Sequence, residues 1–140
     1  MTDPDLIEKK LAEIETHVRE LKTLADLERL RADVKEERFV THTLQLAIQA
    51  ALDAASHIVS DERLGEPRTY RELFALLRRA GWLEDGLSGR LQQMAGFRNL
   101  LVHGYADVEL DVVEEILSDR LDDLNEFVTS VRDRLPGSEP

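Results

Sequence analysis

One short segment of this chain gathers the residue types that can act on a phosphodiester bond. It ends at Tyr105 and contains Arg98, Asn99 and His103. A histidine can take the proton from a ribose 2'-hydroxyl or return one to the leaving oxygen, because imidazole titrates near neutral pH. An arginine can stabilise the charge that builds on the phosphoryl oxygens, and an asparagine can hold an oxygen without adding charge. This chemistry needs no metal ion, and the segment contains no carboxylate that would bind one.

The spacing of these residues does not by itself build a site on one helix face. Arg98 and His103 are five positions apart, about 140° around an ideal helix, whereas Asn99 and His103 share a face. Two arrangements would bring the arginine and the histidine together. The helix can end at Gly104, so that His103 turns toward a groove, or a two-fold dimer can let Arg98 of one chain complete the site of the other. The residues alone favour a structural interpretation, in which His103 caps the helix end and Arg98 pairs with an acid.

Two residues outside the segment are candidates for the border of such a site. Asp53 and His57 are four positions apart on one predicted helix and could form a hydrogen bond. The favoured interpretation is a structural pair that orients its neighbours, although it could also line the cleft. His17 and His42 lie on different predicted helices without the spacing of metal ligands, so no metal site is expected.

Apolar residues with helical spacing predict two long helices in the first half of the chain. Pro4 suits a first turn, and the stripe after it predicts a helix over residues 5–31. The stripe consists of Ile7, Leu11, Ile14, Val18, Leu21 and Ala25. Asp33 and Glu36 resemble a capping box that starts a second helix, which continues to Val59 through an alanine-rich middle.

Two more helices are predicted after a loop that contains glycine and proline. Thr69 is the expected cap of a short helix, and Gly81 stands where glycine commonly closes a helix. A fourth helix begins at Asp85 or Ser88 and stops near Gly104.

The last predicted helix has Asp107 as its cap, and no stretch alternates with the period of a strand. The sequence therefore predicts an all-α fold, an up-down bundle of four main helices plus one short helix. At 140 residues the chain suits one domain, which we expect over residues 1–135, followed by a flexible tail at 136–140.

Composition excludes several classes of protein. The absence of cysteine rules out disulfides, thiolate chemistry and zinc ribbons. The acidic N-terminus lacks the basic start and apolar run of a signal peptide, and no window is long and apolar enough to cross a membrane. A cytoplasmic protein without a membrane partner is expected.

The charge distribution complicates the prediction of a nucleic-acid partner. The net charge is −11, which opposes phosphate binding, yet residues 63–98 carry seven arginines against four acids. We expect the acidic stretch 107–126 to face solvent or a basic partner. Six arginines would instead contribute to the cleft side: Arg68, Arg71, Arg78, Arg79, Arg90 and Arg98. The alternative is that these arginines pair with neighbouring acidic helices.

The run from Phe97 to Tyr105 resembles the Arg-x4-His signature of the HEPN superfamily, in the extended Arg-x4-His-x-Tyr form of the HepT-like family. The polar residue after Arg98 and the helical setting belong to that pattern. The resemblance covers about residues 35–130, because runs in the preceding helices are also similar, namely residues 37–38, 44–48, 53–59, 67–70 and 73–74.

The resemblance implies an HEPN-like fold and a metal-independent, cofactor-free endoribonuclease that acts as a toxin on RNA such as tRNA or mRNA. Carried over by position, Arg98 and His103 would be catalytic, and Asn99 would support them. Tyr105 would accept adenylyl groups from a minimal nucleotidyltransferase antitoxin, and the added phosphates would repel RNA. A homodimer with a shared cleft, and a hetero-oligomer with the antitoxin, are also implied.

Two other functions are kept as alternatives. The chain could be a non-catalytic subunit that presents a nucleotide or another substrate to a nucleotidyltransferase. In that case the His103→Ala substitution would not improve cell growth, and the activity of the nucleotidyltransferase would depend on this chain. The acidic last helix also fits a structural bundle in a larger complex, for which Arg98→Ala would affect stability alone.

Overall fold

The computed structural model contains helices and no strands in the part of the chain that it describes. That part comprises residues 2–103 and 110–136, without the side chains of Val102 and His103. The last helix is continuous but has three parts, the middle one a π-helical segment. The elements are α1 (Pro4–Leu24), the 3-10 turn η1 (Leu27–Arg29), α2 (Val34–Asp61), α3 (Tyr70–Arg79), α4 (Asp85–His103), α5 (Leu110–Glu115), the π segment η2 (Ile116–Arg120) and α6 (Leu121–Arg134).

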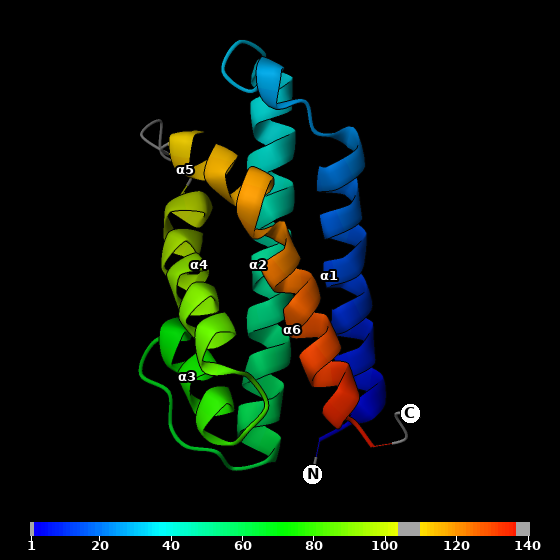
Figure 1. The fold of residues 1–140 in the computed structure, drawn as a ribbon, viewed down its shortest axis with the longest axis vertical. Helices are drawn as coiled ribbons and strands as arrows, with labels where there is room; N and C mark the ends of the chain where they lie inside the picture. The colour runs from blue at the N-terminus through cyan, green and yellow to red at the C-terminus, as the bar shows by residue number, and fades with distance from the viewer. Residues whose placement is uncertain (1, 104–109, 137–140) are drawn as a thin grey trace.

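The predicted bundle of four long helices and one short helix is confirmed. Helix α2 is central, since α1, α3, α4 and α6 all pack against it. Figure 1 shows α6 crossing in front of α2, between α1 and α4, with α3 beside the lower half of α4. This arrangement leaves one side of α2 facing α3 and α4, and the candidate site lies there.

The core forms where the apolar stripes of the helices meet. The five α1 residues Ile7, Leu11, Ile14, Val18 and Leu21 are buried, as their 4-3-4-3 spacing predicts. On the other side, the rings of Phe74 and Phe127 meet edge to face with centroids 5.7 Å apart and join α3 to α6. Burying each large apolar side chain contributes about 1.5–3 kcal/mol, so these contacts fix the positions of the helices.

The prediction that the first helix extends to residue 31 is wrong. Helix α1 ends at Leu24, because the backbone of Ala25 is extended and Asp26 caps the separate turn η1 by accepting a hydrogen bond from the Glu28 amide. Leu24 is largely exposed, so continued helix would gain little burial there.

The predicted helix caps are confirmed at some ends and wrong at one. The Thr69 hydroxyl accepts from the Glu72 amide at 3.3 Å, and Gly81 adopts φ +83°, the left-handed conformation expected after a helix. Asp33 caps α2, but Glu36 does not complete the box. Its carboxylate accepts from the Asp26 amide at 2.9 Å instead.

Other expectations concern parts of the chain outside the described residues. Asp107, the predicted cap of the last helix, and residues 137–140 of the predicted tail both lie there. Among the helices of the described part, each is too short or too polar to cross a lipid bilayer.

Candidate active site

Helix α4 carries Arg98 and Asn99 and is fastened to α3 by a buried hydrogen bond. The fully buried Ser88 hydroxyl donates to the carbonyl oxygen of Phe74 at 3.0 Å. A hydrogen bond of this kind contributes about 0.5–1.5 kcal/mol to stability. The bond therefore helps to fix α4 relative to α3, whose first residue is Tyr70.

Arg98 is held on three sides by uncharged groups. Its Nε donates to Gln49 Oε1 on α2 at 2.9 Å, and its Nη1 donates to Asn99 Oδ1 at 3.3 Å. Its Cζ lies 4.8 Å from the centroid of the Tyr70 ring, a cation–π contact. Within the described residues Arg98 makes no ion pair, so its positive charge is oriented but not neutralised.

A second layer of contacts orients Gln49. The Gln49 amide nitrogen donates to Asp53 Oδ1 at 2.8 Å, and Asp53 Oδ2 lies 3.6 Å from the ammonium nitrogen of Lys10 on α1. The amide donor faces Asp53, so the amide oxygen of Gln49 is turned toward Arg98. A chain of polar contacts thus links α1, α2 and α4.

His57 does not join this chain. Its side chain is exposed on α2, and among the described residues the expected hydrogen bond between Asp53 and His57 is absent. Asp53 therefore orients Gln49 rather than His57.

The C-terminal part of the predicted segment lies largely outside the described residues. His103 is described as a backbone position in α4, four residues after Asn99, but its side chain lies outside the described part. Gly104 and Tyr105 lie wholly outside it. The catalytic role of His103 and the modification of Tyr105 stay predictions.

A groove lies beside Arg98 where α3 begins. We call it the Tyr70 groove; it measures about 420 Å³ and is lined by Ser56, Pro67, Arg68, Thr69, Tyr70, Leu73 and Asn99. Asn99 belongs both to this lining and to the contacts of Arg98. The groove is therefore continuous with the arginine.

Of the six arginines expected at the cleft, some lie near the Tyr70 groove and others form ion pairs. Arg68 lines the Tyr70 groove, and the Arg71 guanidinium packs closely against Gly96 of α4, where a larger side chain would not fit without displacing it. Arg78 pairs with Asp85 at 3.3 Å instead. The expectation is therefore wrong for Arg78, and also for Arg90, which belongs to a different cluster.

Arg90 binds the last helix. Its Nε donates to Asp123 Oδ1 at 2.8 Å, and its Nη2 donates to Glu126 at 3.2 Å. The Asp123 carboxylate raises the pKa of the Arg90 guanidinium further above its ordinary value. For this arginine the alternative expectation, pairing with an acidic helix, is correct.

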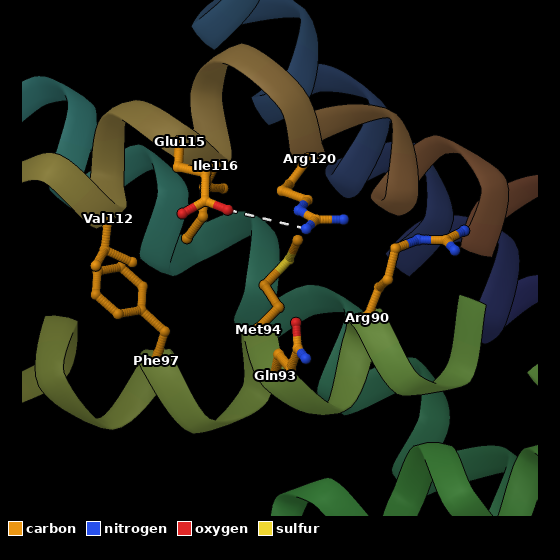
Figure 2. Close-up of a pocket in the computed structure, with 8 residues that line it drawn as sticks. All are labelled: Arg90, Gln93, Met94, Phe97, Val112, Glu115, Ile116 and Arg120. Carbon is orange, nitrogen blue, oxygen red and sulfur yellow. Dashed lines mark ion pairs between the residues drawn. The ribbon is translucent and has the colours of Figure 1, made fainter. Parts of the chain in front are cut away.

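A smaller cavity of about 110 Å³ lies between α4 and the start of the last helix. Figure 2 shows Phe97 facing Val112 at one end, and an ion pair between Glu115 and Arg120 beside Met94. Arg98 and Asn99 do not line this cavity. It is a gap in the packing of the π segment rather than an extension of the Arg98 site.

Two residues of the site were missed as partners of Arg98. Gln49 was not singled out at all, and Tyr70 entered only as part of a matching run. A signal was present for Gln49, since it is a polar residue within an alanine-rich helix and stands four positions before Asp53. Within residues 2–103 and 110–136, no three acidic or histidine side chains gather closely enough to hold a metal ion.

Comparisons with known proteins place this geometry in a family context. The family model described as ribonuclease HepT-like matches residues 7–131. The chain is 30% identical over 129 residues to the mRNA nuclease HepT of Shewanella oneidensis, an alignment that covers 91% of this chain and 97% of the relative. It is also 28% identical over 135 residues to the tRNA nuclease HepT of Aphanizomenon flos-aquae, covering 95% of this chain and 92% of that protein.

A solved structure of a toxin is similar along its whole length. The tri-AMPylated HEPN toxin of Shewanella oneidensis, in complex with the MNT antitoxin, superposes with a TM-score of 0.86 and 28% sequence identity. The match covers 94% of this chain and 100% of that one.

Proposed function

This chain belongs to the ribonuclease HepT-like family, and on that premise we propose that it is the toxin of a toxin-antitoxin pair, an endoribonuclease that cleaves RNA without a metal ion. One observation carries the proposal. Arg98 is held by the neutral groups of Gln49, Asn99 and Tyr70, so its charge stays available for a phosphate.

In the proposed reaction His103 moves the proton and Arg98 stabilises the charge on the phosphoryl oxygens. His103 takes the proton of the ribose 2'-hydroxyl, whose oxygen then attacks the adjacent phosphorus. The bond to the 5'-oxygen breaks, and that oxygen receives a proton, leaving a cyclic phosphate and a 5'-hydroxyl. Asn99 orients Arg98 and can bind a phosphate oxygen from its side of the site.

We propose that a minimal nucleotidyltransferase neutralises this toxin by adding adenylyl groups to Tyr105. The support comes from a relative, since the similar Shewanella oneidensis toxin is tri-AMPylated and bound to an MNT antitoxin. Added phosphates would bring negative charge next to the segment and oppose RNA binding.

We also propose that two copies form a homodimer whose sites share one cleft. The support is the resemblance to the HepT-like family, which implies this dimer.

Inducible expression tests this function in cells. Wild type should arrest growth, His103→Ala should not, and co-expression of the proposed nucleotidyltransferase partner should restore growth of the wild-type strain. Equal growth of the wild-type and His103→Ala strains, at equal levels of folded protein, would refute the proposed toxin.

A further inference from the structure

The Tyr70 groove combines an aromatic wall with polar groups at its edges. Its apolar lining comes from Pro67, Leu73 and the Tyr70 ring, while Ser56 and Thr69 offer hydroxyls. Its volume of about 420 Å³ falls within the usual range for small-molecule sites, about 300–1,000 Å³. The lining therefore suits a flat ligand that also carries hydrogen-bonding groups, such as a nucleoside.

Tyr70 is held in place at the start of α3 and is partly exposed. The Arg98 Cζ atom lies 4.8 Å from the centroid of the Tyr70 ring, yet Tyr70 remains 42% exposed. Its position is rigid because Thr69 caps α3 and the Glu72 carboxylate accepts a hydrogen bond from the Arg68 amide at 2.6 Å. An exposed aromatic ring held in place next to a cation is the usual platform for an unpaired base.

The groove and Arg98 are neighbouring parts of one surface. Asn99 lines the groove and also accepts a hydrogen bond from Arg98, and Tyr70 touches both. A base and its phosphate are likewise joined through a single ribose, so a nucleotide with its phosphate at Arg98 can reach the Tyr70 ring. Arg68, at the rim of the groove, can contact the next phosphate.

We infer that the Tyr70 groove binds the base of the ribonucleotide next to the scissile phosphate of a single-stranded RNA, with the base stacked on Tyr70. This inference rests on the proposed function, because it assumes that RNA lies at Arg98. Stacking uses the flat face that every base has, so the groove selects unpaired RNA over paired RNA rather than one sequence.

The test measures binding to two RNA probes in EDTA, with His103→Ala as the common background so that RNA is not cut. One probe is oligoadenylate, and the other is a ribose-phosphate oligomer of the same length without bases. The parent should bind oligoadenylate about tenfold more tightly than the abasic oligomer. Tyr70→Leu should abolish this preference for oligoadenylate over the abasic oligomer, whereas Tyr70→Phe should retain it.

Two arginines near opposite ends of α3 give a matched control, since Arg68 stands just before the helix and Arg79 is its last residue. Arg68→Gln should weaken binding of both probes about equally, because phosphate contacts do not depend on the base. Arg79→Gln removes the same charge from the exposed far end of α3 and should leave binding of both probes unchanged. A purely structural role for Tyr70 would lower binding of both probes and the thermal stability of the variant.

The outcomes separate this inference from the proposed function. If the parent binds neither probe and the wild type cleaves no RNA, the proposed function itself fails. If RNA is cleaved but Tyr70→Leu still prefers oligoadenylate to the abasic oligomer, the groove inference is overturned and the ribonuclease stands. If binding of free AMP requires Tyr70 but binding of oligoadenylate does not, the groove binds a mononucleotide, and the inference about RNA is also overturned.

Discussion

Arg98 differs from the paired arginines of this protein in the chemistry of what holds it. Arg90 and Arg132 are fixed by carboxylates, which satisfy their charge as well as their hydrogen bonds. Arg98 is fixed by two amide oxygens and a ring face. An ion-paired guanidinium would have to break its pair to receive a phosphate, whereas Arg98 has no such pair among the described residues.

Asn99→Asp tests this difference with almost no change in shape. The new carboxylate would stand where the amide oxygen accepts from Arg98, so it should pair with the guanidinium and repel phosphate. We expect RNA cleavage to fall by about tenfold or more, with Tm unchanged because the side chain is exposed. Asn99→Ala is the control and should lose less activity than Asn99→Asp. Equal activity of Asn99→Asp and wild type would mean that the charge of Arg98 is not used.

At the residue level the sequence singled out Arg98 and Asn99 as candidates for the chemistry, but it did not predict which groups hold them. Arg98 and Asn99 stood out by residue type and by resemblance to a family signature. Gln49 did not, because it is 49 positions from Arg98 and the contact exists only after α2 and α4 have packed. The role of His103 stays a prediction, since its side chain lies outside the described residues.

Among the elements, α1 and α6 are joined by one arginine that binds two acids. The Arg132 guanidinium donates to Glu15 through Nη1 and Nη2 at 3.2 and 3.0 Å, and also binds Glu8. Its hydrogen bonds lower the pKa of the Glu15 carboxyl below the ordinary value of 4.5. Because the folded-state pKa is lowered, the stabilisation is present above about pH 4.5 and is lost as the pH falls through the lowered pKa.

Glu15→Gln should therefore destabilise the protein at neutral pH and matter less in acid. Both side chains are more than one third exposed, so screening limits the effect to about 0.5 kcal/mol and lowers Tm by about 2 °C at pH 7. Thermal melts of the two proteins between pH 7 and pH 3 should converge toward the acid end. A gap in Tm that widens below pH 4.5 would contradict the assignment of this ion pair.

The π segment η2 makes an ion pair that a regular helix would not favour. Glu115 and Arg120 are five positions apart, which separates them by about 140° in an α-helix, but their charged atoms lie 3.8 Å apart. We expect Arg120→Gln to speed amide hydrogen exchange in residues 116–120 and to shift Tm by less than about 2 °C. Ser118→Ala, an exposed change in the same segment, should leave the exchange rates unchanged. Unaltered exchange in Arg120→Gln would show that the pair does not hold the π geometry.

Periodicity predicted the helices well where they bury a stripe and poorly where the chain changes register. The α1 stripe and the Thr69 cap are correct because they depend on local rules. The end of α1 at Leu24 and the π segment were not predicted. Both involve contacts that helical periodicity does not encode, namely the hydrogen bonds of Asp26 with the Glu28 amide and with Glu36, and the packing of the last helix against α4.

Over the whole molecule, part of the excess of acidic side chains forms ion pairs with basic side chains of other elements. Arg31 pairs with Asp111 and Glu114, and Lys22 pairs with Asp122, so basic groups of the same chain meet part of the stretch that was expected to face solvent or a basic partner. These pairs place acidic charge against α1, the η1 region and α4. The Tyr70 groove and Arg98 lie where α2, α3 and α4 meet, and the residues of those pairs do not line the groove.

Control of the toxin by its partner can be tested at Tyr105. If adenylylation of Tyr105 is the antidote, Tyr105→Phe should leave cleavage intact but remove rescue by the nucleotidyltransferase. Mass spectrometry of the co-expressed wild type should show added AMP units, and the Tyr105→Phe protein should show none. Full rescue of a toxic Tyr105→Phe protein would mean that the antitoxin acts by binding alone.

RNA cleavage by the purified, unmodified chain in EDTA tests the role of Arg98 most directly. We expect the wild type to cut single-stranded RNA and to leave cyclic phosphate ends. Arg98→Gln should cut about 100-fold more slowly, because one group that stabilises the transition state is lost. His103→Ala should lose at least as much activity. Cleavage that persists undiminished in Arg98→Gln, or folded wild type that cuts no RNA, would contradict the central claim that Arg98 stabilises the cleavage of a phosphodiester bond.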